Sequence, residues 1–81
     1  MSWYQTAYWV REEDDGTPIS VYRRRLIDGQ LVMDRYTYTG QWSNAYDYLL
    51  RVIEEPNFRS ITAEEANRLL PKIARSRANV R

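Results

Sequence analysis

The chemistry that this sequence can carry is limited by the residue types it lacks. The chain holds no histidine and no cysteine, which excludes a Ser-His-Asp triad, a cysteine nucleophile and the usual Cys and His zinc site. The acidic run at 12–15 does not match the calcium-loop spacing. Neighbouring acids such as Glu54-Glu55 and Glu64-Glu65 point apart on a helix. We therefore expect a protein that is not an enzyme and that needs no metal or cofactor.

Arginine and aromatic side chains are the remaining candidates. Arginine outnumbers lysine eleven to one, and its planar guanidinium group binds carboxylate and phosphate and stacks on aromatic rings. Trp, Tyr, Met and Arg are enriched at protein interfaces, while Arg and aromatic residues on an open sheet can also stack the bases of single strands. The candidate partner-binding residues are Trp9, Arg11, Tyr22, Arg24, Met33 and Arg35.

A β-hairpin is predicted to bring four of these residues together. Residues 19–38 contain two strand-like runs around Asp28-Gly29, a dipeptide that favours a two-residue type I′ turn with positive φ at both positions. This turn places Arg23 opposite Asp34, and the opposite charges support the register. Because side chains alternate between the faces of a strand, one face carries Tyr22, Arg24, Met33 and Arg35.

A further strand is predicted at residues 3–12, where aromatic residues favour extended structure. A turn at Asp15-Gly16 connects it to the hairpin. The resulting register brings Trp9 and Arg11 onto the face with the other candidates. A slip of one residue would reverse this assignment.

The opposite face is predicted to be the core of the protein. The two turns place Val10 opposite Val21, and Val21 opposite Tyr36, so apolar side chains form contiguous rows across the strands. This face carries Tyr8, Val10, Ile19, Val21, Tyr36 and Tyr38. We expect the helices that follow to cover it.

A first helix is predicted to end near Glu55, before Pro56. Either Ser43 or Asn44 can cap its beginning. Apolar residues at helical spacing, which we expect to be buried, are Tyr46, Leu49, Leu50 and Ile53. Trp42 stands beside the helix start, where it either caps the end of the core or is an exposed anchor.

A second helix is predicted from a capping box, in which Thr62 caps the helix and Glu65 reaches back. Its buried stripe contains Ala66, Leu69 and Leu70. Pro71 removes a backbone hydrogen bond and clashes with the preceding turn. The helix therefore either ends near Leu70 or kinks and continues as a short turn that carries Ile73.

These elements predict an α+β fold, a three-stranded antiparallel β-meander followed by two α-helices packed on one face. Residues 1–75 are expected to form a single small domain, and residues 76–81 a flexible basic tail. No apolar run is long enough to cross a membrane. The amino terminus does not resemble a signal peptide, and the lack of cysteine is compatible with a reducing compartment, so we expect a cytoplasmic protein.

Two functions from different classes fit the candidate face. The first is a small protein-binding module, acting as an interaction adaptor or an inhibitor. The alternative is a single-stranded nucleic-acid-binding protein that uses the same face together with the basic tail. The net charge of only +1 favours the protein-binding hypothesis, because affinity for nucleic acid comes largely from phosphate contacts.

The partner is expected to cover whatever apolar surface the helices leave exposed. Two short helices on one face would leave a large patch containing Trp9, Tyr22, Leu26, Leu31 and Met33, which exceeds what monomers usually expose. A second copy of the chain is one candidate, since two-fold dimers are the commonest oligomers. A different protein would cover the patch equally well, and a face covered by the chain itself is the remaining alternative.

Overall fold

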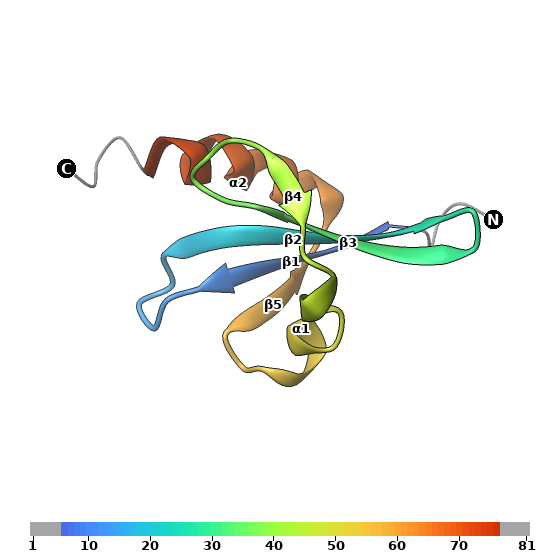
Figure 1. Cartoon of the computed structure of the whole chain (residues 1–81). Coiled ribbons are helices and arrows are strands. Elements are labelled where there is room, and N and C mark those ends of the chain that lie inside the picture. The colour runs from blue at the N-terminus through green and yellow to red at the C-terminus, as the bar shows by residue number, and fades with distance from the viewer. Residues whose placement is uncertain (1–5, 77–81) are drawn as a thin grey trace.

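The computed structural model describes residues 6–76 and shows a five-stranded antiparallel sheet in the order β4-β3-β2-β1-β5, with helical segments on both faces (Figure 1). The long strands and the long helix are β1 (Thr6–Glu12), β2 (Pro18–Ile27), β3 (Gln30–Tyr36) and α2 (Ala63–Ser76). The short elements are β4 (Trp42–Asn44), the 3₁₀ helix η1 (Tyr46–Tyr48), α1 (Arg51–Glu54) and β5 (Phe58–Ile61).

The predicted three-stranded meander is wrong, because two short strands extend the sheet at both edges. β4 pairs with the end of β3 from Asp34 to Tyr36, and β5 pairs with β1 from Tyr8 to Arg11. These strands have only three and four residues, which is too short for a period-two pattern to be recognised. β1 is therefore an interior strand and not an edge.

The register of the three central strands is the predicted one. Asp28 and Gly29 both have positive φ, 51° and 79°, as a type I′ turn requires. Arg23 lies opposite Asp34, and Val10 lies opposite Val21. The alternation of side chains between the two faces, on which the candidate site depends, is thereby confirmed.

The turn between β1 and β2 is closed by its own polar groups. The Glu13 amide donates to the Thr17 carbonyl at 2.9 Å, and Gly16 adopts φ 89°, a conformation open to glycine at no steric cost. Hydrogen bonds from the side chain and then the backbone amide of Thr17 lower the pKa of the Asp15 carboxyl below its ordinary value. The acids of this turn thus serve its local structure.

On one face of the sheet, α2 covers an aliphatic core. The buried residues of this cluster are Val10, Val21, Ile61, Ala66 and Ile73. Partly buried Tyr8, Tyr36 and Trp42 pack against the cluster, so Trp42 takes the core position that was one of its two predicted roles. Ile19 and Tyr38, predicted for this core, are more than a third exposed because they lie beyond the paired region of β3.

Helix α2 begins as predicted and continues through the proline. Thr62 Oγ1 accepts a hydrogen bond from the Glu65 amide at 3.1 Å, the N-cap contact of a capping box. Pro71 lies inside the helix, which extends to Ser76. Ile73, two residues beyond the proline, is 1% exposed, and the burial of this large side chain offsets the lost backbone hydrogen bond.

The opposite face is covered by the segment from η1 to α1, so the prediction that both helices pack on one face is wrong. The buried residues of this second cluster are Trp9, Tyr22, Met33, Ala45, Val52 and Phe58. Tyr48 and Leu49 pack against it from the covering segment. Figure 1 shows α2 and α1 on opposite sides of the sheet.

The predicted first helix also differs in length and in its buried side. Ser43 and Asn44, its expected caps, belong to β4, and Asn44 Oδ1 accepts from the Tyr46 amide at 3.2 Å. The helical part starts late and begins as a 3₁₀ turn, which shifts the helical phase. Consequently the side chains of Tyr46, Leu50 and Ile53 are 59%, 64% and 63% exposed.

Candidate functional site

The structure divides the six predicted partner-binding residues into a buried and an accessible group. Trp9 is 7% exposed, and Tyr22 and Met33 are 0% exposed. These three side chains form the core beneath η1 and α1, so in this fold they cannot offer their surface to a partner. The apolar patch expected on an open sheet face is covered by the chain itself.

The three predicted arginines each lie over an aromatic ring on this face. The guanidinium carbon of Arg24 is 5.3 Å from the Trp9 ring centroid. Those of Arg35 and Arg11 are 5.5 Å and 5.8 Å from the rings of Tyr48 and Phe58. Contacts of this kind contribute about 0.5–1 kcal/mol each where they are partly exposed. They also limit the freedom of the arginine side chains.

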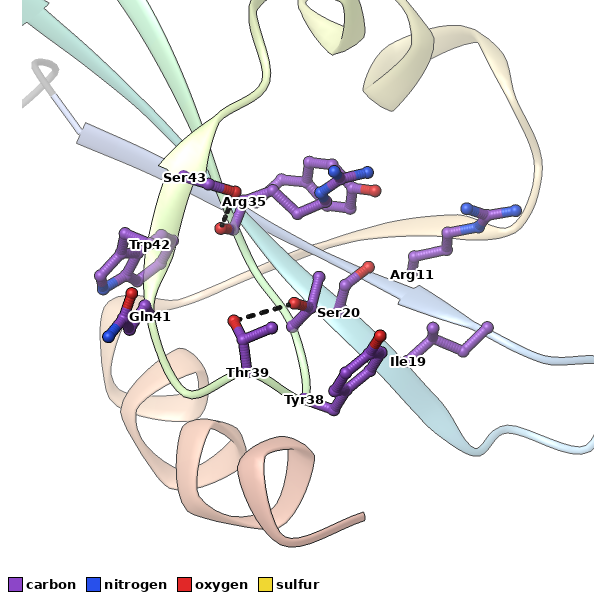
Figure 2. A pocket seen from close by; sticks show the side chains of 11 residues that line it. Arg11, Ile19, Ser20, Arg35, Tyr38, Thr39, Gln41, Trp42 and Ser43 are labelled. Carbon is purple, nitrogen blue, oxygen red and sulfur yellow. Dashed lines mark hydrogen bonds between the residues drawn. The ribbon is translucent and has the colours of Figure 1, made fainter. Parts of the chain in front are cut away.

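Two of these arginines and Tyr22 border one hollow of about 600 Å³ at the end of the sheet away from the Asp28-Gly29 turn (Figure 2). The residues that line it are Arg11, Ile19, Ser20, Tyr22, Arg35, Thr37, Tyr38, Thr39, Gln41, Trp42 and Ser43. Arg24 is not among them. The hollow lies where the covering segment is absent, because η1 and α1 together are only seven residues long.

The pairing of the strands explains why these side chains share a face. Arg11 of β1 lies opposite Ser20 of β2, and Arg35 of β3 lies opposite Tyr22 of β2. Ser20 and Tyr22 are two positions apart and point to the same side. The central strand therefore carries two hydroxyl groups between two flanking guanidinium groups.

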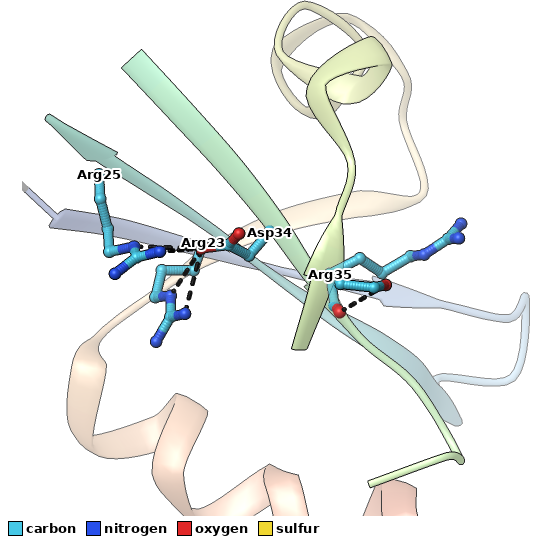
Figure 3. A network of polar contacts seen from close by, with 5 residues as sticks. Arg23, Arg25, Asp34 and Arg35 are labelled. Carbon is cyan, nitrogen blue, oxygen red and sulfur yellow. Dashed lines mark hydrogen bonds and ion pairs between the residues drawn. The ribbon is translucent and has the colours of Figure 1, made fainter. Parts of the chain in front are cut away.

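The hollow is cationic and has no internal counter-charge. None of its eleven lining residues, all within the described part of the chain, is Asp or Glu. On the other side of the sheet, Asp34 Oδ2 accepts from Arg25 Nη2 at 2.7 Å and from Arg23 Nη2 at 3.1 Å. Figure 3 shows these two arginines converging on Asp34 while Arg35 extends away from them.

Three donors beside the hollow lack an acceptor. The Nε groups of Arg11 and Arg35 and the hydroxyl of Tyr22 are buried and have no hydrogen-bond partner among residues 6–76. Arg35 donates from Nη1 to the Tyr48 hydroxyl at a long 3.5 Å. Buried polar groups are normally paired, and an unpaired one indicates a site short of a partner.

Sequence reasoning missed the hydroxyl residues that complete the hollow. Ser20 lies two residues before Tyr22 on the same strand, so the alternation of side chains could have identified it. Ser43 comes from β4 and donates to the Arg35 carbonyl at 3.4 Å. It could not have been found, because β4 itself was not predicted.

Other candidate surfaces are less specific. Within residues 6–76 no group of three His, Cys, Asp or Glu side chains is placed to hold a metal ion. Large apolar side chains that remain exposed include Leu31 and Tyr46, which line one shallow depression, and Leu50 and Ile53. The homodimer stays a prediction.

Comparison of the chain with protein-family models, with curated proteins and with solved structures finds no match. In the part of the chain that the structure describes, no helix is long and apolar enough to cross a membrane. The expected basic tail lies outside the described residues from position 77 onward, as do positions 3–5 of the first predicted strand.

Proposed function

We propose that this chain is a protein-binding module that receives an acidic side chain of its partner in the hollow beside Arg11 and Arg35. The observation that supports the proposal is the pair of guanidinium groups with no carboxylate among the lining residues. Charge complementarity selects an acidic partner, because an anion gains from both cations and a cationic segment is repelled. The proposal includes a cytoplasmic location and no enzymatic activity.

The local structure supports a preorganised site. Arg11 and Arg35 project from the two strands that flank β2 and lie over Phe58 and Tyr48. An arginine already held in place loses less conformational freedom when it binds a carboxylate. Tyr38, about half exposed, stands at the rim, where interface aromatic residues are enriched.

The test measures binding of a fluorescein-labelled glutamate-rich peptide by fluorescence anisotropy, with the glutamine counterpart as control ligand. We expect Arg11→Gln and Arg35→Gln each to weaken binding about tenfold, as loss of a charge-assisted hydrogen bond predicts. Arg68→Gln is the matched control. Arg68 is exposed on α2, on the other side of the sheet. Equal affinity for both peptides would contradict the proposal.

Single-stranded nucleic acid is the competing ligand. The same instrument measures a labelled oligothymidine between about 50 and 200 mM salt, over which phosphate-driven binding falls steeply. We expect the oligonucleotide to bind more weakly than the glutamate peptide throughout this range. Tighter oligonucleotide binding that is lost in Arg11→Gln and Arg35→Gln would replace protein binding by nucleic-acid binding.

A further inference from the structure

We infer that the hollow takes a phosphate monoester carried on a side chain of the partner segment, in preference to a carboxylate. The inference rests on the proposed function, since it names the anionic group that the same hollow receives. It follows from the charge of the hollow, from its unpaired donors and from its size.

The first step concerns charge. Arg11 and Arg35 bring two positive charges to a hollow whose lining, in the described residues, contains no acid. A carboxylate neutralises one of these charges, whereas a phosphorylated side chain carries a charge of about −1.5 to −2 at pH 7. A dianion therefore matches the hollow and a monoanion leaves it cationic.

The second step concerns hydrogen bonds. The unpaired donors beside the hollow come from three adjacent strands, with Arg11 on β1, Tyr22 on β2 and Arg35 on β3. Ser20 and Thr37 add hydroxyl groups to the lining. A phosphate monoester presents three strong acceptor oxygens, while a carboxylate presents two. Three acceptors suit two guanidinium groups on separate strands, Arg11 on β1 and Arg35 on β3, whereas a carboxylate has fewer oxygens to share between them.

The third step separates this hollow from other arginines of the sheet. Arg23 and Arg25 share the carboxylate of Asp34. Arg59 is held by two acids, with Nη2 at 2.9 Å from Glu12 and 3.2 Å from Glu65. Arg24 lies over Trp9 and does not reach the hollow. Arg11 and Arg35 are thus the two arginines that line the hollow, and neither forms an ion pair with an acid of the described residues.

The fourth step concerns the carrier of the phosphate. The volume of about 600 Å³ lies in the range of pockets that hold whole small molecules and leaves space beyond the phosphate itself. Ile19 and Tyr38, both more than a third exposed, provide an apolar rim. A side chain on a peptide segment suits this rim, and the net charge of +1 offers little general attraction for nucleic acid or anionic lipid.

The experiment compares three labelled peptides that differ only at a central phosphoserine, glutamate or serine. We expect the phosphoserine peptide to bind at least about tenfold more tightly than the glutamate peptide near pH 7.5. The advantage should shrink several-fold near pH 5, because the second proton of phosphate binds with a pKa of about 6 while glutamate stays largely ionised.

The titratable and charged side chains that surround the hollow are the arginines Arg11 and Arg35 and the tyrosines Tyr22, Tyr38 and Tyr48. None of the lining residues is an acid, and the chain contains no histidine. The serine peptide, measured over the same pH range, reports any change in binding that comes from the protein and not from the phosphate.

The variants separate binding from folding. We expect Arg11→Gln and Arg35→Gln each to reduce the preference for phosphoserine over glutamate by at least about threefold, with Arg68→Gln unchanged. Tyr22→Phe is a second control, because the hydroxyl belongs to a side chain that is 0% exposed. Thermal denaturation checks that each variant is folded.

The outcomes distinguish the inference from the proposed function. Equal binding of the phosphoserine and glutamate peptides, sensitive to both arginines, overturns the phosphate inference and leaves the proposed function in place. Failure of both peptides to bind overturns the two together. A 5′-phosphorylated oligothymidine or inorganic phosphate that binds as tightly as the phosphoserine peptide also overturns the inference, because the carrier then contributes nothing.

Discussion

The two faces of the sheet treat their arginines in different ways. On the face covered by α2, Arg23 and Arg25 converge on Asp34, which is 8% exposed. On the face covered by η1 and α1, Arg11 and Arg35 lie over aromatic rings and meet no acid in the hollow. Arginine is thus paired with an acid of the chain on one face, whereas on the other face no acid lines the hollow beside it.

The covering segments explain this difference. Helix α2 has fourteen residues and spans about 20 Å at 1.5 Å per residue, and its buried Ala66 and Ile73 belong to one cluster with Val10 and Val21 of the sheet. Helix α1 has four residues and covers a much shorter part of the opposite face. The uncovered end of that face forms the hollow. Both covering segments bury a core, and the shorter one leaves the end of its face open.

The largest effect is expected at Met33, which tests whether the face under η1 and α1 is covered. Since Met33 is 0% exposed beneath η1 and α1, Met33→Ala should lower the free energy of unfolding by about 2–5 kcal/mol. Urea denaturation followed by circular dichroism measures it. Leu31→Ala, two residues earlier on the same face and 49% exposed, should cost less than about 1 kcal/mol. Similar values for both variants would mean that this face is not covered.

A smaller effect is expected at Asp34, which pairs with two arginines on the α2 face and has no equivalent among the residues that line the hollow. Asp34→Asn removes the charge that accepts from Arg23 and Arg25 and leaves their guanidinium groups side by side. We expect a loss of about 2 kcal/mol, below the full value for a buried pair because the arginines are partly exposed. Glu55→Gln, which removes the exposed partner of Arg51, is the control and should cost under about 0.5 kcal/mol.

The smallest effect on the free energy of unfolding is expected at Tyr22. Its hydroxyl is buried and has no partner within residues 6–76, so Tyr22→Phe should leave the free energy of unfolding unchanged or raise it by up to about 1 kcal/mol. The measurement is the urea midpoint at constant slope. A loss of more than about 1 kcal/mol would show that the hydroxyl is paired within the folded chain.

The hairpin turn, the register of the central strands and the start of α2 can be predicted from the sequence. The Asp28-Gly29 turn fixes the register of β2 and β3, because both residues adopt the positive φ of a two-residue type I′ turn. The side-chain alternation then assigns Arg11, Tyr22 and Arg35 to one face. Thr62 starts α2 through a hydrogen bond to a residue three positions away. These features depend on neighbours in the chain or on a single turn.

Which parts of each face are covered depends on contacts between segments that are far apart in the chain. The pairing of β5 with β1 joins residues about fifty positions apart, and no local pattern in four residues specifies it. The placement of η1 and α1 opposite α2 depends on the apolar area available on both faces at once. That placement buries Trp9 and Met33 and leaves Arg11 and Arg35 partly exposed beside the hollow. The reason is spatial, because a short helix covers only the strand residues that lie beneath it.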